Sequence, residues 1–460
     1  MEAGLSVLKT IATAASLAIA TQSAGWAQSL IRDTEIEHVM RGYADPILEA
    51  AGLETNDVDF YLVADPEINA FVTGGQNIFM HTGMIVEADT PNQLKGVIAH
   101  ETGHITGAHL ARSGDAMSAA RAPMFVSLGL GVLAALAGEG GAAGALMASS
   151  QQFGALSYLT YSRAQEASAD QAALQFLEDA HESADGLVEF FERFRYQEVM
   201  SQARRFPYFR SHPLSSDRIA SLRRGVAASP YSGNTDTPEE IAELRRIQAK
   251  IYGFLVDPEY VFYRYPETDQ SLPARYARAV AYYHDARLDE ALDEIESLLE
   301  EEPDNPYFHE LHGQMLFESG HPDEAIAPNR RSVELEPTAP LLRINLAIAM
   351  IATENPEYRE EAAQQLRVAL DIEPDNAFAW YQLSILHDRN GDTALAQLAT
   401  AEQAYATGDT VRAYQFAMRA RDGLEQGTPA WFRASEIQAV SQPTEEDLRE
   451  MRRRQRQRMN

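Results

Sequence analysis

Apolar positions near the start of the globular part follow two different spacings. Residues 31–53 repeat them at the helical period, which predicts an amphipathic helix. Residues 58–64 form a short run of residues that favour strands. Residues 68–81 hold two apolar stretches on either side of Gly74-Gly75. These runs predict a small sheet or hairpin.

A second helix is predicted to begin after Thr90. Thr90 can cap it, Pro91 suits the first turn, and Gln93 completes a capping box. The pattern predicts that this helix runs to about Arg112 and that another covers about 158–177. Helices therefore dominate, and the first domain is predicted to be α+β, mostly helical with a small β-sheet.

A repeated pattern occupies the C-terminal part of the chain. Pro303, Pro337 and Pro374 recur at spacings of 34 and 37 residues, and the longer interval has extra residues near Asn355-Pro356. Aligning the repeats on these prolines brings small residues into register. The first helix of each repeat has Ala279, Gly313 and Ala347 at one position, and the second helix has Ala291, Ala325 and Ala362, continued by Ala396 in a fourth unit. The pattern resembles the tetratricopeptide repeat, whose helical hairpins stack into a solenoid. Residues 405–437 are expected to end that solenoid.

The first 27 residues have the organisation of a secretory signal peptide. A short apolar run covers 11–20, and Gly25-Trp26-Ala27 places small residues before a cleavage site at Gln28. The alternative is a buried N-terminal helix. A second apolar stretch at 124–148 is interrupted by glycines and is too short to span a bilayer. It predicts a buried hairpin or, alternatively, a loop in peripheral contact with a membrane.

Charge and cysteine content narrow the function classes. The 460 residues include 38 Lys and Arg against 68 Asp and Glu, which gives a net charge of −30 and disfavours nucleic-acid binding. Residues 273–437 carry 30 acidic and 13 basic side chains, so −17 of that charge lies on the repeats. This surface is either simply solvated or suited to basic or mixed partners. The absence of cysteine excludes thiolate ligands and a cysteine nucleophile.

The segment His100-Glu101-Thr102-Gly103-His104 carries the candidate chemistry. Histidines at i and i+4 project from one helical face, so both imidazoles can bind one metal ion. Glu101 lies beside them as a candidate general base. A metzincin would have its third histidine at position 110, which is Leu110 here, and His109 is expected to point away.

The third ligand is therefore expected from a later helix. Glu166 and Asp170 are four residues apart and lie among alanines, which indicates a buried helical face. Glu166 is predicted to bind the metal, and Asp170 to orient a ligand histidine. Two imidazoles and one carboxylate are typical of a catalytic zinc (Zn2+) site with an open position.

Together these features resemble peptidase family M48, in its repeat-bearing periplasmic subgroup, over nearly the whole mature chain. Asn69-Ala70-Phe71 before Gly74-Gly75 is similar to the family's strand beside the cleft. Ser211-His212-Pro213 with Arg218 is similar to its His-Pro segment. Thr73 departs from the proline that relatives often have there, which leaves the rigidity of that loop in question.

The resemblance implies a zincin-type metallopeptidase domain followed by an all-α tetratricopeptide-repeat solenoid. His100, His104 and Glu166 would bind one zinc ion, and Asp170 and Arg218 would support them. Glu101 would be the general base. Asn69 and His212 would bind the substrate or the transition state. His212 is alternatively a reversible fourth ligand that inhibits the enzyme.

Two functions remain open. One is a periplasmic zinc endopeptidase that degrades misassembled outer-membrane proteins, with the repeats binding substrate or the barrel-assembly machinery. The other is mainly a chaperone or adaptor for outer-membrane protein assembly with a latched, rarely used protease site. An integral-membrane protease is disfavoured, because the mature chain has no convincing spanning segment. The expected domains are a signal peptide (1–27), the metallopeptidase domain (28–226), a helical linker (227–272), the repeats (273–437) and a basic tail (438–460).

Overall fold

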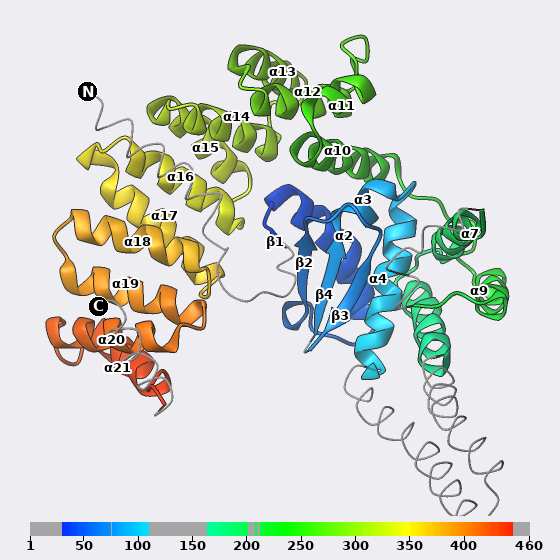
Figure 1. Ribbon diagram of the computed structural model, residues 1–460, viewed down its shortest axis with the longest axis horizontal. Coiled ribbons are helices and arrows are strands. Elements are labelled where there is room, and N and C mark those ends of the chain that lie inside the picture. The colour runs from blue at the N-terminus through cyan, green and yellow to red at the C-terminus, as the bar shows by residue number, and fades with distance from the viewer. Residues whose placement is uncertain (1–29, 75, 110–162, 201–207, 209–211, 445–460) are drawn as a thin grey trace, which may run out of the picture. The chain divides into compact units, whose positions relative to one another are not determined.

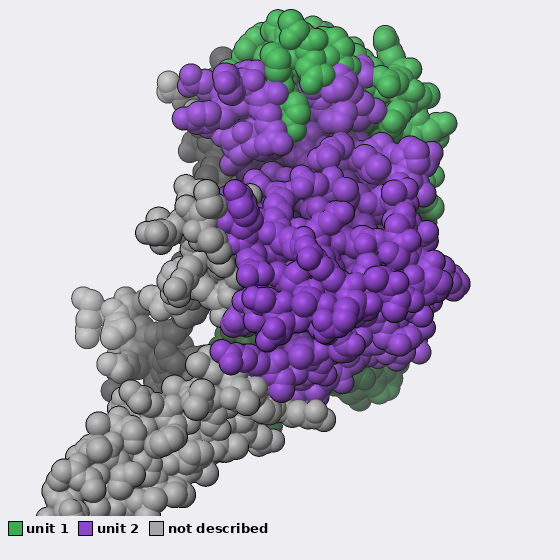
Figure 2. Space-filling model, turned by 90° about the vertical axis from the view of Figure 1, so that its right-hand side faces the viewer, with its two compact units in different colours: residues 1–16, 265–270, 278–460 green, residues 17–264, 271–277 purple. Residues whose placement is uncertain are grey.

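The computed structural model describes residues 30–74, 76–109, 163–200, 208 and 212–444 (Figure 1). The predicted signal peptide, the apolar segment 124–148 and the tail beyond 444 lie outside these residues. The described chain divides into an N-terminal unit, residues 30–264 with 271–277, and a repeat unit, residues 265–270 with 278–444 (Figure 2).

The N-terminal unit is built around one mixed four-stranded sheet with the order β1-β2-β4-β3. Its strands are β1 (Leu30–Ile31), β2 (Asp59–Val63), β3 (Ala70–Thr73) and β4 (Asn77–His81). β3 and β4 form the predicted antiparallel hairpin, with Ala70 opposite Met80. β2 instead runs parallel to β4. β3 is therefore an edge strand of the described sheet.

Helices surround this sheet, with α2 and α4 beside it (Figure 1). The helical elements are α2 (Thr34–Ala50), η1 (Thr55–Asp57), α3 (Thr82–Glu87), α4 (Pro91–Thr106), residues 163–179, α7 (Asp185–Met200), α9 (Ser216–Ala228), α10 (Pro238–Leu255) and α11 (Pro258–Arg264). α4 is central, because all its residues from Pro91 to His104 are buried. Its apolar side chains join one core with those of α2, α7 and the sheet.

Both ends of α4 differ from the prediction. Thr90 makes no side-chain capping bond. Gln93 instead accepts a hydrogen bond from the backbone N–H of Asp89 at 3.0 Å, so the predicted capping box does not form. The helix ends at Thr106, before the predicted Arg112. Ala108 then takes a φ of +50°, a left-handed conformation that cannot continue a helix.

A buried lysine anchors the N-terminal half of α4. Lys95 Nζ lies 2.7 Å from a carboxylate oxygen of Glu182 and 2.6 Å from one of Glu240. Asn92 adds a hydrogen bond to the backbone oxygen of Ser183 at 2.7 Å. α4 is thus tied to the chain before α7 and to α10, which fixes the helix that carries His100, Glu101 and His104.

The repeat unit is a series of stacked helical hairpins. Its helices are α12 (Leu272–His284, which begins in the N-terminal unit), α13 (Leu288–Glu301), α14 (Pro306–Glu318), α15 (Pro322–Leu335), α16 (Pro340–Ala352), α17 (Arg359–Ile372), α18 (Ala377–Arg389), α19 (Thr393–Ala406), α20 (Thr410–Gly423) and α21 (Pro429–Val440). The three aligned prolines follow α13, α15 and α17, as predicted. The aligned small residues are buried because the helices approach closely. A Cβ added to Gly313 would lie 2.6 Å from the side chain of Asn329.

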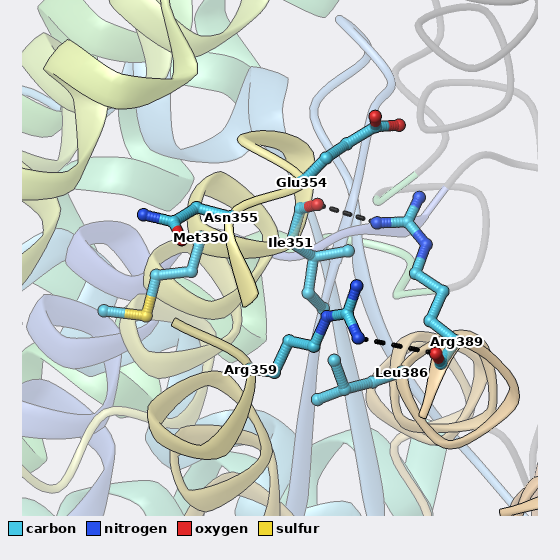
Figure 3. A pocket seen from close by; sticks show the side chains of 7 residues that line it. All are labelled: Met350, Ile351, Glu354, Asn355, Arg359, Leu386 and Arg389. Carbon is cyan, nitrogen blue, oxygen red and sulfur yellow. Dashed lines mark hydrogen bonds between the residues drawn. The ribbon is translucent and has the colours of Figure 1, made fainter. Parts of the chain in front are cut away.

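The extra residues of the longer repeat interval form a short 3-10 helix, η2 (Pro356–Tyr358). Glu354 enters it with a φ of +58°. A small hollow beside it is bridged by two arginines, as Figure 3 shows. Arg389 donates to the backbone oxygen of Ile351 at 2.8 Å, and Arg359 donates to that of Arg389 at 3.5 Å. The insertion is therefore absorbed locally without breaking the stack.

The predicted fold class is confirmed: a mostly helical α+β domain precedes an all-helical repeat. In the part of the chain that the structure describes, no helix combines the length and the apolar character needed to cross a membrane.

Candidate metal centre

Four buried side chains from three parts of the chain converge in the N-terminal unit. His100 and His104 project from α4, Glu166 from helix 163–179, and His212 from the segment before α9. Each offers one ligand atom, and these four atoms lie within 4.8 Å of one another. The sequence predicted three of them as ligands and the fourth as a reversible one.

The distances show how closely the donors face each other. Nε2 of His104 lies 3.2 Å from Nε2 of His100. These two nitrogens lie 3.5 and 3.4 Å from the carboxylate oxygens of Glu166. Nδ1 of His212 lies 3.2 Å from the same carboxylate. Histidine and carboxylate donors turned toward one point are a suitable set for a divalent transition metal.

Close helix packing brings Glu166 to the two histidines. α4 and helix 163–179 meet at Gly103, where an added Cβ would lie 2.8 Å from the backbone oxygen of Ala169. Real Cβ contacts are not that short, so a side chain at position 103 would push the helices apart. Gly103 thus sets the distance between the two helices that carry the candidate ligands.

A second layer of charged groups holds the ligands. Oδ1 of Asp170 lies 3.1 Å from Nδ1 of His100. Arg218 donates two hydrogen bonds of 2.7 Å to the Asp170 carboxylate, and its Nη1 lies 2.9 Å from Glu166. Burial alone would raise the pKa of Asp170. The hydrogen bonds from Arg218 and His100 outweigh burial and hold that pKa below its usual value.

Glu101 faces the same space from α4. Its side chain is fully buried, and neither carboxylate oxygen has a hydrogen-bond partner among the described residues. Burial raises the pKa of Glu101, against the opposing effect of His212 and His100. A buried carboxylate without a hydrogen bond is costly to keep, which is typical of a functional group.

His212 reaches both the metal group and this carboxylate. Its Nδ1 faces His100 Nε2 at 3.3 Å, while its Nε2 lies 3.5 Å from Oε1 of Glu101. The ring of Tyr208 packs over the imidazole, with centroids 4.7 Å apart. Sequence reasoning missed Tyr208, because an aromatic residue four positions before a histidine carries no specific signal.

Tyr208 also links this segment to the sheet. Its backbone N–H donates to the oxygen of Ile68 at 3.3 Å, just before β3. Burial raises the pKa of its phenol well above the usual value, and the negative charge of Glu101 adds to that effect, so the hydroxyl stays protonated.

Asn69 is not among the grouped ligands. Its Nδ2 lies 3.5 Å from Nε2 of His81, and its backbone oxygen accepts from His81 N–H at 3.0 Å. Asn69 therefore begins the β3–β4 pairing.

The expectation that His109 points away is wrong in part. Its ring is not in the ligand group, but its Nδ1 lies 3.0 Å from Nδ1 of His104. The left-handed turn at Ala108 reverses the chain and returns the ring to α4. Helical periodicity could not foresee this contact, because the helix has already ended.

Comparison with known proteins gives the family. Residues 30–226 match the profile of peptidase family M48. The Escherichia coli (strain K12) beta-barrel assembly-enhancing protease is 25% identical over 362 residues, which cover 76% of this chain and 72% of that protein. The Yersinia pestis protein of the same name is 25% identical over 337 residues, 71% of this chain and 68% of that one.

Solved structures also match part of this chain, and YrrB is one of them. YrrB, described as a TPR protein with an unusual peptide-binding site, covers 37% of this chain and 89% of its own with a TM-score of 0.32 and 20% identity. The helical repeat is defined by the stacked hairpins of α12 to α21. The family profile spans α4, helix 163–179 and the His212 segment, and that family is one of metal-dependent proteases. The chain is therefore a metalloprotease, and its residues 30–226 are a peptidase family M48 domain.

Proposed function

We propose that this chain is a zinc-dependent endopeptidase of the periplasm that degrades misassembled outer-membrane proteins. The observation that carries the proposal is the group formed by His100, His104 and Glu166 beside the buried carboxylate of Glu101, which makes no hydrogen bond among the described residues. Imidazole and carboxylate donors of this kind are typical of catalytic zinc. When bound, zinc supplies Lewis acidity to the scissile carbonyl and to the attacking water.

In this proposal the chain's own residues handle the proton and the substrate. Glu101 takes a proton from the attacking water and returns it to the leaving amine, a task suited to a carboxylate with a raised pKa. Asp170 lies 3.1 Å from His100 Nδ1 and so favours the proton on that nitrogen, which leaves Nε2 free to bind zinc. An unfolded substrate strand would pair with the edge strand β3, next to Asn69.

His212 gives the site a resting state. With its Nδ1 among the ligand atoms and its Nε2 beside Glu101, the imidazole occupies the space that water and a scissile carbonyl need. We infer that it acts as a reversible fourth ligand and must leave before hydrolysis. This arrangement also supports the second candidate function, a chaperone or adaptor with a latched protease site.

The decisive variant is Glu101→Gln, with the wild-type chain as control. Zinc should stay bound at one ion per chain. The rate of hydrolysis of an unfolded outer-membrane protein should fall at least about a thousandfold, as rates do when a catalytic group is removed from an enzyme. Substantial remaining activity in a zinc-loaded Glu101→Gln protein would contradict the mechanism.

The same variant separates the two functions. The repeats are proposed to bind substrates or the barrel-assembly machinery, since relatives named for β-barrel assembly align across both units. Glu101→Gln protein expressed in the exporting cell should trap uncut outer-membrane proteins. Capture of assembly components alone, with normal protein turnover in cells that carry the variant, would favour the adaptor. Export is tested by N-terminal sequencing of the mature chain. If the signal peptide is removed as predicted, the mature chain begins at Gln28.

A further inference from the structure

His104 uses its two ring nitrogens in opposite directions. Nε2 faces the ligand group, 3.5 Å from Glu166 and 3.2 Å from His100 Nε2. Nδ1 faces His109, whose own Nδ1 lies 3.0 Å away. The two imidazoles meet edge to face, with an interplanar angle of 78°. One ring atom of His104 is thus available to a metal while the other is held by a neighbouring histidine.

The chain is built to put His109 in that place. α4 ends at Thr106, and Ala108 turns back with a φ of +50°. A Cβ at Gly107 would lie 2.4 Å from the His109 ring, so only glycine leaves room for it. Gln165, next to Glu166, donates to the backbone oxygen of His109 at 3.0 Å. His109 is 8% exposed and is therefore fixed between both ligand-bearing helices.

We infer that His109 is a positioning residue for the metal site, acting as the hydrogen-bond acceptor that fixes the tautomer and ring orientation of His104. This inference rests on the proposed zinc site. An imidazole that binds zinc through Nε2 carries its proton on Nδ1 and must donate it. Among the described residues, Nδ1 of His109 lies 3.0 Å from that nitrogen and is placed to accept the proton. His109 then carries its own proton on Nε2.

The two histidine ligands are therefore supported differently. His100 Nδ1 faces the carboxylate of Asp170 at 3.1 Å, whereas His104 Nδ1 faces the ring of another histidine at 3.0 Å. Loss of such an outer partner typically lowers metal affinity by about 10- to 100-fold. Losing the His109 acceptor should thus weaken zinc binding without removing any ligand.

The test compares His109→Ala with His109→Gln in the full chain. Glutamine keeps an acceptor oxygen, and alanine removes it. Zinc dissociation constants come from competition with a fluorescent chelator, and circular dichroism of the metal-free proteins checks folding. His109→Ala should raise the zinc dissociation constant about 10- to 100-fold with unchanged metal-free melting. His109→Gln should stay within about threefold of wild type. His38→Ala, which removes an exposed histidine of α2, is the matched control.

Each result is decisive. Equal zinc affinity of His109→Ala and wild type would overturn the inference. Equal losses of zinc affinity in His109→Ala and His109→Gln would also overturn it, because lost packing alone would then explain both losses. If His109→Ala does not fold, His109→Gln decides: a loss above tenfold contradicts the role as acceptor, and near wild-type affinity supports it. Failure of the wild-type chain to bind zinc would instead overturn the proposed function.

Discussion

Nε2 of His212 lies 3.5 Å from Oε1 of Glu101. The other nitrogen of the same ring lies 3.2 Å from Glu166, so one imidazole bridges the candidate base and a candidate ligand. Tyr208 packs over this imidazole and is itself hydrogen-bonded to the chain before β3. His212, the chain before β3 and the candidate base Glu101 are therefore connected through direct contacts.

His212 occupies the space between Glu101 and Glu166, so its removal tests whether it latches the site. His212→Ala should raise peptide hydrolysis while zinc remains bound through His100, His104 and Glu166. A latch closed in about nine of ten molecules predicts roughly a tenfold increase. The measurement is the hydrolysis rate per bound zinc on an unfolded substrate, with His38→Ala as control. Unchanged or lower activity with full zinc occupancy would count against the latch.

Gly103→Ala should damage the metal site by separating two helices. The added Cβ would lie 2.8 Å from the backbone oxygen of Ala169, and overpacking of this kind costs about 1–3 kcal/mol. Zinc content should fall, because Glu166 moves away from α4. Atomic emission on purified protein and thermal melting measure both effects.

Gly42→Ala is the matched control. An added Cβ at this position in α2 meets nothing within 4 Å. Alanine favours helix over glycine by about 0.5–1 kcal/mol. This variant should therefore melt at the same or a higher temperature with full zinc content. Equal behaviour of the two glycine variants would show that helix contact at position 103 does not set the site.

Arg218→Ala should destabilise the metal-free protein. It removes two hydrogen bonds to Asp170 and the contact with Glu166, leaving both buried carboxylates without their cation. Breaking a buried pair in this way costs about 3–5 kcal/mol. Urea unfolding in the presence of a chelator measures the loss. Added zinc should restore part of it, since a divalent cation replaces the missing charge; a loss under about 1 kcal/mol would be inconsistent with this account.

The stability lent by Lys95 should depend on pH. Burial would raise the pKa of Glu240, but its hydrogen bonds from Lys95 and Thr237 lower it overall. A carboxylate with a lowered folded-state pKa contributes stability above its unfolded pKa of about 4.3 and loses it as pH falls through the folded value. The difference in unfolding free energy between wild type and Lys95→Met should therefore shrink from about pH 7 to below about pH 4.

Urea titrations of both metal-free proteins across this range provide the measurement. A difference that stays constant, or that grows in acid, would mean that Lys95 stabilises α4 through packing rather than through its carboxylate partners.

Features that depend on local periodicity were predictable from the sequence. Helical geometry alone brings His100 and His104 to one face, four residues apart. The repeat prolines predicted the ends of α13, α15 and α17, because proline cannot continue a helix. The two strands around Gly74-Gly75 followed from their apolar runs.

Capping was harder to predict. Thr90 and Gln93 fit the capping-box pattern, yet Gln93 accepts from Asp89 instead. A side-chain bond at a helix end depends on the direction in which the preceding chain arrives, and the local sequence does not determine that direction.

The sequence by itself therefore determined the chemical types of the site, two histidines and a base on one helix, together with the hairpins that follow it. Tertiary structure decided how the distant groups reach them. Glu166 and His212, both predicted from the sequence, arrive through the close approach at Gly103 and the packing of Tyr208. His109, predicted to point away, returns through the turn at Ala108. The physical reason is that spacing along a helix fixes directions only within that helix. Contacts between separate segments depend on how the whole core packs.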